Sequence, residues 1–342
     1  MAESREMVAS TDSKPIPSQR FTQLVMREYQ SAAEHEFTER EMTIIRNYFV
    51  CIDQTLRKAD ADRIRKNENN RDHSFDNNTP ITWANINLQQ LARDLAHYAH
   101  MGLDMMESNT LFPIPYKDNK SDTYTITLML GYNGLRYQAE KYALVPFKNV
   151  TVEVVYSNDN FRVIKKSARN PVEAYEFDIT NPFDRGQPIG VFGYIEYDDP
   201  TKNKLVIFNK ADIEKRKPAY ASAEFWGGEK KVKEKGQYVQ KQLDGWVPEM
   251  WEKTMKRAIY SAKYIPRDPA KMDASYQYIA QREQQYANIA VEAEVAENAN
   301  AEPISLPKQP QQAPQAAPVQ QEAATPTQYV TAADYDNDEV PF

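Results

Sequence analysis

The sequence predicts an α+β protein, in which an antiparallel sheet is flanked by N-terminal and C-terminal helices and followed by a disordered C-terminal tail. Three observations support this. Apolar residues recur at helical spacing up to about residue 101 and again after Pro248. Between these parts, short segments of alternating apolar residues are separated by turn residues, as in antiparallel strands. After Tyr286 the chain is rich in Ala, Glu, Gln and Pro, which cannot build a core.

The N-terminal part is expected to be helical. Residues 1–20 are polar, which predicts a disordered leader. Helical spacing of apolar residues then extends over about residues 21–66. Within this stretch Thr38 is followed three residues later by Glu41, a capping box that predicts a helix start. A further helix is predicted over 88–101, because its leucines share one face.

The middle of the chain changes to a period of two. Thr123–Leu130 alternates large apolar residues with threonines, which is typical of a half-buried strand. Further strands are expected at 150–156, 161–165, 189–197 and 205–208, with a short helix at 134–142. Helical patterning returns at about 210–217 and 248–263.

These elements divide the chain into five expected segments. They are a disordered leader (1–20), a helical N-terminal region (21–79), an α+β core (80–285), a disordered Ala/Gln/Pro-rich linker (286–333) and an acidic tip (334–342).

Charge is distributed unevenly along the chain. The net charge of −7 arises almost entirely from residues 281–342, which carry −8, whereas residues 1–280 carry +1. Residues 200–271 alone carry +8. This asymmetry predicts a basic working surface and an acidic tail.

Composition also excludes several classes of protein. The single cysteine, Cys51, rules out a disulfide framework and a Cys-based zinc cluster, and four histidines leave little for any metal site. No apolar run is long enough to span a membrane, and the N-terminus lacks the apolar core of a signal peptide. We therefore expect a cytoplasmic protein that contacts no membrane.

The sequence lacks the common catalytic and nucleotide-binding motifs. It has no phosphate-binding loop, no dinucleotide fingerprint, no zinc-protease helix and no nucleophile elbow. The carboxylates Asp178, Asp184, Asp198 and Asp199 could be imagined as nuclease metal ligands, but their spacing fits surface loops equally well. We expect no enzyme activity, no catalytic residues, no metal and no cofactor.

A glycine-framed turn is the first candidate binding feature. In Gly131-Tyr132-Asn133-Gly134 a strand ends and a helix begins. Backbone N–H groups at a helix start attract phosphate, Tyr132 offers a ring for a base, and Arg136 offers charge. Many such turns serve only to reverse the chain.

Basic residues interleaved with aromatics form the second feature. Lys165 and Lys166 follow Phe161, and Lys210 and Trp226 lie farther along, before the lysine-rich stretch 230–235. Proteins that bind single strands combine a cationic groove with aromatic platforms. A solvated lysine-rich loop explains residues 230–235 equally well.

The third feature is the helix that begins at Pro248. Lys253, Lys256 and Arg257 form one stripe on it, while Met255 and Ile259 fall on the neighbouring face. One side would pack against the protein, and the other would present cations to a nucleic-acid backbone. A stabilising surface helix shows the same pattern.

Taken together, these features resemble the RecT family of phage annealing recombinases, over about residues 80–270. The resemblance rests on the order of six short motifs: Met101-Gly102-Leu103-Asp104, Phe112-Pro113-Ile114-Pro115-Tyr116, Gly131-Tyr132-Asn133-Gly134, Phe208-Asn209-Lys210-Ala211-Asp212-Ile213-Glu214, Glu249-Met250-Trp251-Glu252-Lys253-Thr254 and Tyr264-Ile265-Pro266. One segment departs from it, since Glu140-Lys141-Tyr142-Ala143 stands where the family usually has a basic pair and a glycine.

The resemblance implies ATP-independent annealing of single-stranded DNA in phage-type homologous recombination within a bacterial host. It implies partners as well: single-stranded DNA, the annealed duplex, further copies in a filament or ring, and an exonuclease. It supports a DNA-facing role for Tyr132, Arg136, Lys253, Lys256 and Arg257, and Lys210 stands where the family usually has a basic residue. The interleaving of basic and aromatic residues adds Lys165, Lys166 and Trp226 to the expected DNA-binding residues. The alternative is a passive single-strand binding protein without annealing activity.

The C-terminus resembles the acidic tip of bacterial single-strand DNA-binding proteins. Its expected docking residues are Asp336, Asp338, Glu339, Pro341 and Phe342. The terminal carboxylate suits a basic clamp and the phenylalanine ring an apolar pocket. We therefore expect it to bind receptors of the host protein's tip, although an acidic tail can also serve solubility alone.

Overall fold

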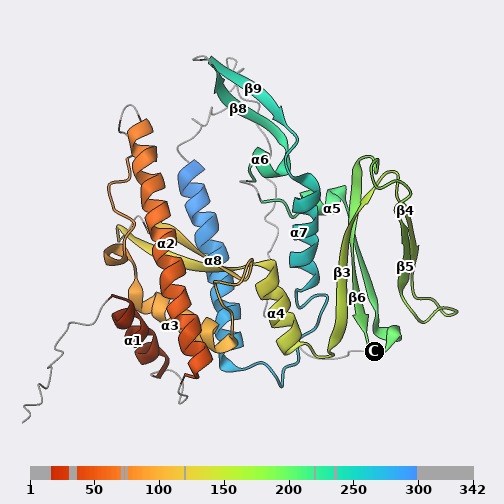
Figure 1. Cartoon of the computed structure of the whole chain (residues 1–342), viewed down its shortest axis with the longest axis horizontal. Helices are drawn as coiled ribbons and strands as arrows, with labels where there is room; N and C mark the ends of the chain where they lie inside the picture. The colour runs from red at the N-terminus through yellow and green to blue at the C-terminus, as the bar shows by residue number, and fades with distance from the viewer. Residues whose placement is uncertain are drawn as a thin grey trace, which may run out of the picture. The chain divides into compact units, whose positions relative to one another are not determined.

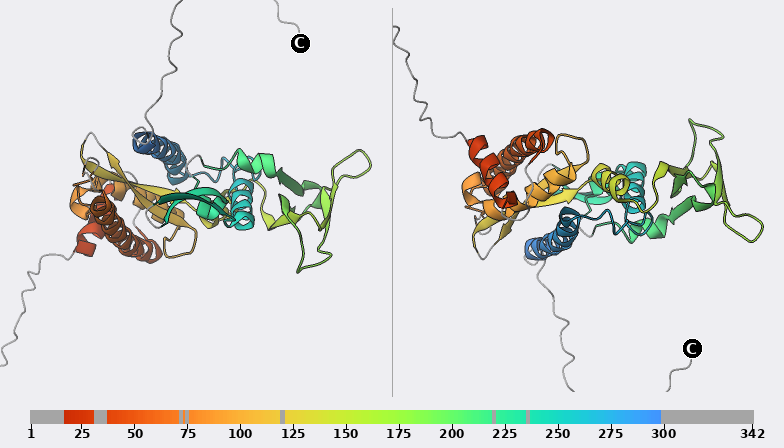
Figure 2. Two further views of the ribbon diagram at one scale, coloured as in Figure 1. Left: turned by 90° about the horizontal axis from the view of Figure 1, so that it is seen from above. Right: turned by 90° about the horizontal axis from the view of Figure 1, so that it is seen from below.

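The computed structural model describes residues 17–30, 37–70, 73, 76–118, 121–218, 221–234 and 237–298 (Figures 1 and 2). The chain divides into residues 1–300, which form one compact unit, and residues 301–342. The expected tip at 334–342 lies outside the described residues.

Helices dominate the N-terminal part, as expected. They are α1 (Pro17–Gln30), α2 (Glu39–Asn69), the short 3₁₀ helix η1 (Trp83–Asn85) and α3 (Leu88–Met101). The predicted capping box is confirmed, since the Thr38 hydroxyl accepts from the Glu41 N–H at 3.3 Å and the Glu41 carboxylate accepts from the Thr38 N–H at 2.7 Å. These bonds satisfy N–H groups that have no partner within the helix.

Two antiparallel strands cover these helices. β1 (Leu111–Asp118) pairs with β2 (Thr123–Leu130), with Leu111 opposite Leu130. The sequence analysis missed β1, because Pro113 and Pro115 lack the N–H that a central strand requires. Within the described chain β1 pairs with β2 alone, and an edge strand tolerates proline.

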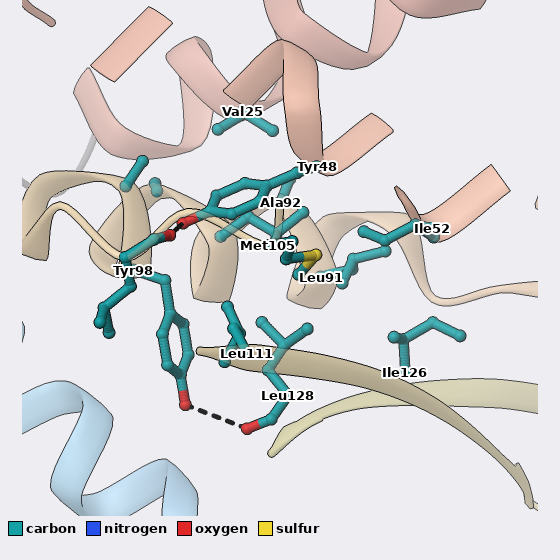
Figure 3. Close-up of a cluster of buried hydrophobic side chains, with 14 of the residues drawn as sticks. Val25, Tyr48, Ile52, Leu91, Ala92, Tyr98, Met105, Leu111, Ile126 and Leu128 are labelled. Atoms are coloured by element: carbon teal, nitrogen blue, oxygen red, sulfur yellow. Dashed lines mark hydrogen bonds between the residues drawn. The ribbon is translucent and has the colours of Figure 1, made fainter. Parts of the chain in front are cut away.

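The first hydrophobic core lies between α1, α2, α3, the two strands and α8 (Ala274–Asn298). Tyr48 and Tyr98 are fully buried in it. Their hydroxyl groups donate to the carbonyls of Leu103 and Leu128, the latter at 3.2 Å (Figure 3). Both rings are therefore buried without leaving a polar atom unsatisfied.

The second core is built on a three-stranded antiparallel sheet. Its strands are β3 (Phe147–Tyr156), β6 (Pro188–Tyr197) and β7 (Lys204–Asn209), in the order β3-β6-β7. α7 (Val247–Ile259) packs against one face of this sheet, and the hairpin of β4 (Asn160–Ile164) and β5 (Ala174–Asp178) covers the other. α4 (Tyr132–Tyr142) joins the two cores, because its Tyr142 belongs to the first and its Ala139 to the second.

The remaining elements are small. They are η2 (Pro200–Lys202), α5 (Lys210–Glu214), α6 (Ala223–Trp226) and the hairpin of β8 (Gly228–Glu234) and β9 (Gln237–Leu243). The predicted α+β class with antiparallel strands is confirmed. α8 continues to Asn298, past residue 286, where the sequence analysis places the start of the linker. No helix in the described ranges is both long and apolar enough to cross a membrane.

Candidate nucleic-acid interface

The start of α4 requires Gly131 and Gly134 because the backbone at Asn109 and Thr110 packs closely against it. A Cβ on Gly131 would lie 2.0 Å from the Asn109 carbonyl oxygen, and one on Gly134 would lie 2.3 Å from that of Thr110. The contact is held by hydrogen bonds, from the Gly131 N–H to Thr110 at 2.9 Å and from the Asn133 N–H to Asn109 at 3.0 Å. The glycines thus allow close backbone approach.

Tyr132 is the first residue of α4, and its side chain is half-buried. Its hydroxyl accepts a hydrogen bond from the Asn109 side-chain amide at 3.0 Å. Asn109 itself has a φ of +56°, a left-handed conformation that asparagine tolerates better than most residues. The Lys256 ammonium lies 5.3 Å from the centre of the Tyr132 ring, within cation–π range. The ring is therefore fixed at its hydroxyl end and lies beside a cation.

α7 has the two faces that the sequence predicts. Trp251, Met255 and Ile259 are buried against the sheet. Lys253 is exposed, and Lys256 lies one turn farther along and forms an ion pair with Glu252. The apolar face fixes how the helix is rotated, and this rotation turns the lysines away from the core.

Arg257 is held by the protein itself. Its guanidinium donates to the Leu130 carbonyl at 2.6 Å, at the end of β2. It also lies near Glu283 of α8, where burial raises the pKa of the carboxyl to about 7 although Arg257 and Arg267 oppose that shift. Arg257 thus links α7 to β2 and α8, directly beside the two lysines.

Arg136 lies one turn into α4 and is exposed. Its guanidinium pairs with Glu140 at 2.8 Å. Arg136 also lies near Tyr260, where burial raises the pKa of the hydroxyl and the guanidinium opposes that shift. We refer to Tyr132, Arg136, Lys253 and Lys256 as the α4–α7 patch.

A protein-family model, described as the RecT family, matches residues 36–267, which is more than half of the chain. The chain belongs to the RecT family. Membership assigns it to DNA binding, recombination and strand annealing of the phage type. No curated protein and no solved structure matches the chain. The matched residues include α2, which lies before residue 80, where the resemblance in short motifs begins.

Two predicted DNA-binding residues of this RecT-family chain lie away from the patch. Lys165 follows β4 and pairs with Glu173, and its ammonium also donates to the Leu205 carbonyl at 3.0 Å. The Lys166 ammonium donates to the carbonyl of Thr201. The β4–β5 hairpin and α7 cover opposite faces of the three-stranded sheet, so the structure does not bring these lysines to the patch.

Neither Lys210 nor Trp226 belongs to the α4–α7 patch, since Lys210 begins α5 and Trp226 ends α6. Lys210 is exposed at the start of α5, which Asn209 and Asp212 cap. Trp226 is half-buried against the second core, and the Lys217 ammonium lies 5.6 Å from its ring centre. Trp226 therefore contributes to packing as well as offering an aromatic surface.

Asn109, which orients Tyr132, was not predicted from the sequence. No periodic pattern marks it, and only its left-handed backbone conformation sets it apart. The predicted docking residues Asp336, Asp338, Glu339, Pro341 and Phe342 lie outside the described residues. Within the described ranges no cluster of three or more His, Cys, Asp or Glu side chains could hold a metal ion.

Proposed function

We propose that the chain binds single-stranded DNA on the α4–α7 patch and anneals complementary strands without ATP. The observation that carries this proposal is the convergence of Tyr132, Arg136, Lys253 and Lys256 in a chain of the RecT family. An aromatic ring beside several cations is the combination that single strands require.

The chemistry follows from the two kinds of side chain. Lys253, Lys256 and Arg136 would neutralise phosphates, and a base stacked on Tyr132 would add roughly 1–3 kcal/mol. Glu252 and Glu140 pair with two of these cations in the absence of DNA. Exposed ion pairs contribute only about 0–1 kcal/mol, so a phosphate can replace a carboxylate at little cost. Binding should tolerate any sequence and weaken with salt.

Base pairing supplies the free energy of annealing, so no nucleotide hydrolysis is needed. The sequence has no phosphate-binding loop to cradle ATP. We infer that several protomers, in a filament or ring, hold one strand while its complement pairs with it. The annealed duplex, and an exonuclease that exposes single strands, would be the other partners, and a bacterial cytoplasm the place of work.

A single assay separates this proposal from its competitors. Complementary labelled strands are mixed with the full chain, without ATP, in the presence and absence of magnesium. Faster duplex formation in both conditions is the expected result. Slowed pairing would indicate a passive single-strand binding protein, and shortened strands in magnesium would indicate a nuclease; either outcome would overturn the proposal.

We further propose that the tip docks on receptors of the host single-strand binding protein's tip, with Phe342 as its apolar anchor. Deleting Phe342 leaves every side-chain carboxylate of 334–339 in place. This deletion should abolish capture of a labelled tail peptide by such a receptor and leave DNA affinity unchanged. If removal of residues 330–342 instead tightens DNA binding at low salt only, the tail competes for the basic patch.

A further inference from the structure

Phe183 is the most exposed of the large apolar side chains in the described residues, with 98% of its surface accessible. It lies in the segment between β5 and β6. Burying a phenylalanine side chain contributes roughly 1.5–3 kcal/mol, so an aromatic ring left fully in water is a candidate for contact with another surface.

The turn that carries Phe183 is held by local hydrogen bonds. The Asn181 side-chain oxygen accepts from the Phe183 N–H at 3.1 Å, and the Asn181 carbonyl accepts from the Asp184 N–H at 3.2 Å. From the turn between β3 and β4, the Asn158 side-chain amide donates to the Asp184 carbonyl at 3.1 Å. These bonds set the position of the Phe183 backbone.

A partly buried ion pair anchors the same turn to the sheet. Arg185 pairs with Asp159, with guanidinium–carboxylate distances of 2.6 and 3.0 Å. The Arg185 guanidinium also lies 4.2 Å from the centre of the Tyr156 ring and donates to the Val154 carbonyl at 2.9 Å. The turn is therefore ordered before any partner arrives, which reduces the entropy lost on binding.

A groove that could accept an apolar ring such as that of Phe183 lies between α2 and β1. It has a volume of about 410 Å³ and is lined by Cys51, Gln54, Thr55, Lys58, Met105, Glu107, Ser108, Asn109, Leu111, Phe112 and Pro113. Phe112 leaves 43% of its surface accessible there. With one lysine and one glutamate, the lining is poorly suited to a run of phosphates. It suits an apolar side chain with a polar rim.

The groove and the turn belong to different cores of the chain. The groove is formed by the first core, and the turn follows the hairpin that covers the second. α4 and α7 lie between α2 and the β4–β5 hairpin (Figures 1 and 2). The groove of one protomer can therefore be filled by the turn of another copy rather than by its own.

We propose that Phe183 of one protomer inserts into the α2–β1 groove of the next. In this arrangement Asp184, beside Phe183, would pair with Lys58, one of the two charged residues of the lining, rather than with Glu107. A contact between two different surfaces repeats head to tail and builds a ring or a filament. Asn109, which lines the groove, also binds the Tyr132 hydroxyl, so this contact lies beside the α4–α7 patch.

The natural cysteine allows a direct test. Cys51 is the only cysteine of the sequence and lines the groove. The variant Pro182→Cys places a second thiol on the exposed turn and keeps the Phe183 ring that the groove would hold. Oxidation by copper phenanthroline and oxygen, without DNA, should yield a ladder of disulfide-linked dimers, trimers and larger species.

Two controls sharpen this test. Leu144→Cys also adds an exposed thiol, with 52% of the leucine surface accessible, and should give no ladder. A chain with both Pro182→Cys and Cys51→Ser, mixed with the natural chain, should stop at dimers, because only the thiol of one chain and Cys51 of the other can then be joined. Cross-linking no faster than for Leu144→Cys, or a disulfide within one chain, would overturn the proposal.

Reversing the charges of Lys58 and Asp184 tests their proposed pairing independently of the disulfide. Lys58→Glu should lower the mean mass measured by sedimentation, and adding Asp184→Lys to the same chain should restore it. If the double variant stays as small as the single one, Lys58 and Asp184 do not face each other. Loss of the ladder with annealing retained would contradict this contact and leave the proposed function standing.

Discussion

Tyr132 owes its position to residues outside its own helix. Gly131 and Gly134 allow the segment at Asn109 and Thr110 to approach, and the Asn109 amide then fixes the tyrosine hydroxyl. A side chain held in this way keeps its ring available at little entropic cost. The ring therefore has the rigidity that a stacking platform needs.

We expect Tyr132→Ala to weaken single-strand binding by roughly 1–3 kcal/mol, because a stacked base loses its platform. Tyr132→Phe keeps the ring and loses only the Asn109 bond, which contributes about 0.5–1.5 kcal/mol to stability. Fluorescence anisotropy with a labelled oligonucleotide measures the first effect, and melting temperatures measure the second. Equal affinities for the two variants would remove Tyr132 from the interface.

At the scale of single residues, the sequence predicts which side chains would contact DNA but not the contacts that hold those side chains in place. Tyr132 and Lys256 are visible as an aromatic and a cation within ordered motifs. The bond from Arg257 to Leu130 joins residues 127 positions apart, and no local pattern reveals such a contact. A helical stripe shows that Arg257 shares a face with Lys253, but not that a carbonyl of another strand lies within its reach.

Among the elements, α7 carries the largest share of the proposed function. Its apolar face packs on the three-stranded sheet, where a Cβ on Gly193 would lie only 2.4 Å from Ile259. Its other face bears Lys253 and Lys256. Arg257 ties its C-terminal half to β2, and Glu283 of α8 lies nearby. The orientation of the lysines thus depends on packing against three neighbours.

Glu283, which lies beside Arg257, makes the free energy of unfolding depend on pH. Burial raises the pKa of its carboxyl from 4.5 to about 7, so the fold favours the protonated form. Between these values the folded chain binds more protons than the unfolded chain, and stability falls as the pH rises. Relative to wild type, Glu283→Gln should gain about 2–3 kcal/mol of unfolding free energy between pH 5 and pH 8, since one pKa unit equals about 1.4 kcal/mol.

Denaturant unfolding of both proteins at the two pH values measures this difference. Histidines and other carboxyl groups titrate identically in both chains, so their contributions cancel in the comparison. A difference in stability that does not change with pH would show that Glu283 is solvated in the folded chain.

Elements with strong local signals are predictable from the sequence, and those defined by their neighbours are not. The capping box at Thr38 and the alternation of β2 both lead to the observed elements. β1 contains prolines, which are excluded from central strands. β8 and β9 are rich in Lys, Glu and Gln. None of these three strands therefore shows the residue pattern that predicts a strand. Pairing with an adjacent strand, rather than propensity, forms them.

At the scale of the whole molecule, we propose that the α4–α7 patch holds single strands for annealing without ATP. Assembly and DNA binding then use adjacent surfaces, because the proposed contact of Phe183 lies in the α2–β1 groove and Asn109 of that groove binds Tyr132. Annealing of long strands would require both assembly and DNA binding, since a row of protomers aligns many α4–α7 patches along one DNA backbone.

The most direct test of this claim is the annealing rate of complementary strands, measured without ATP over a range of salt concentrations. The test variant is Lys253→Gln with Lys256→Gln, and the matched control is Lys148→Gln with Lys202→Gln, which removes two exposed lysines elsewhere. The patch variant should anneal more slowly. Its log–log slope of DNA affinity against salt should flatten by about 1.4, because each phosphate contact on a single strand contributes roughly 0.7. The control should match wild type, and a folded patch variant that also matches it would contradict the claim.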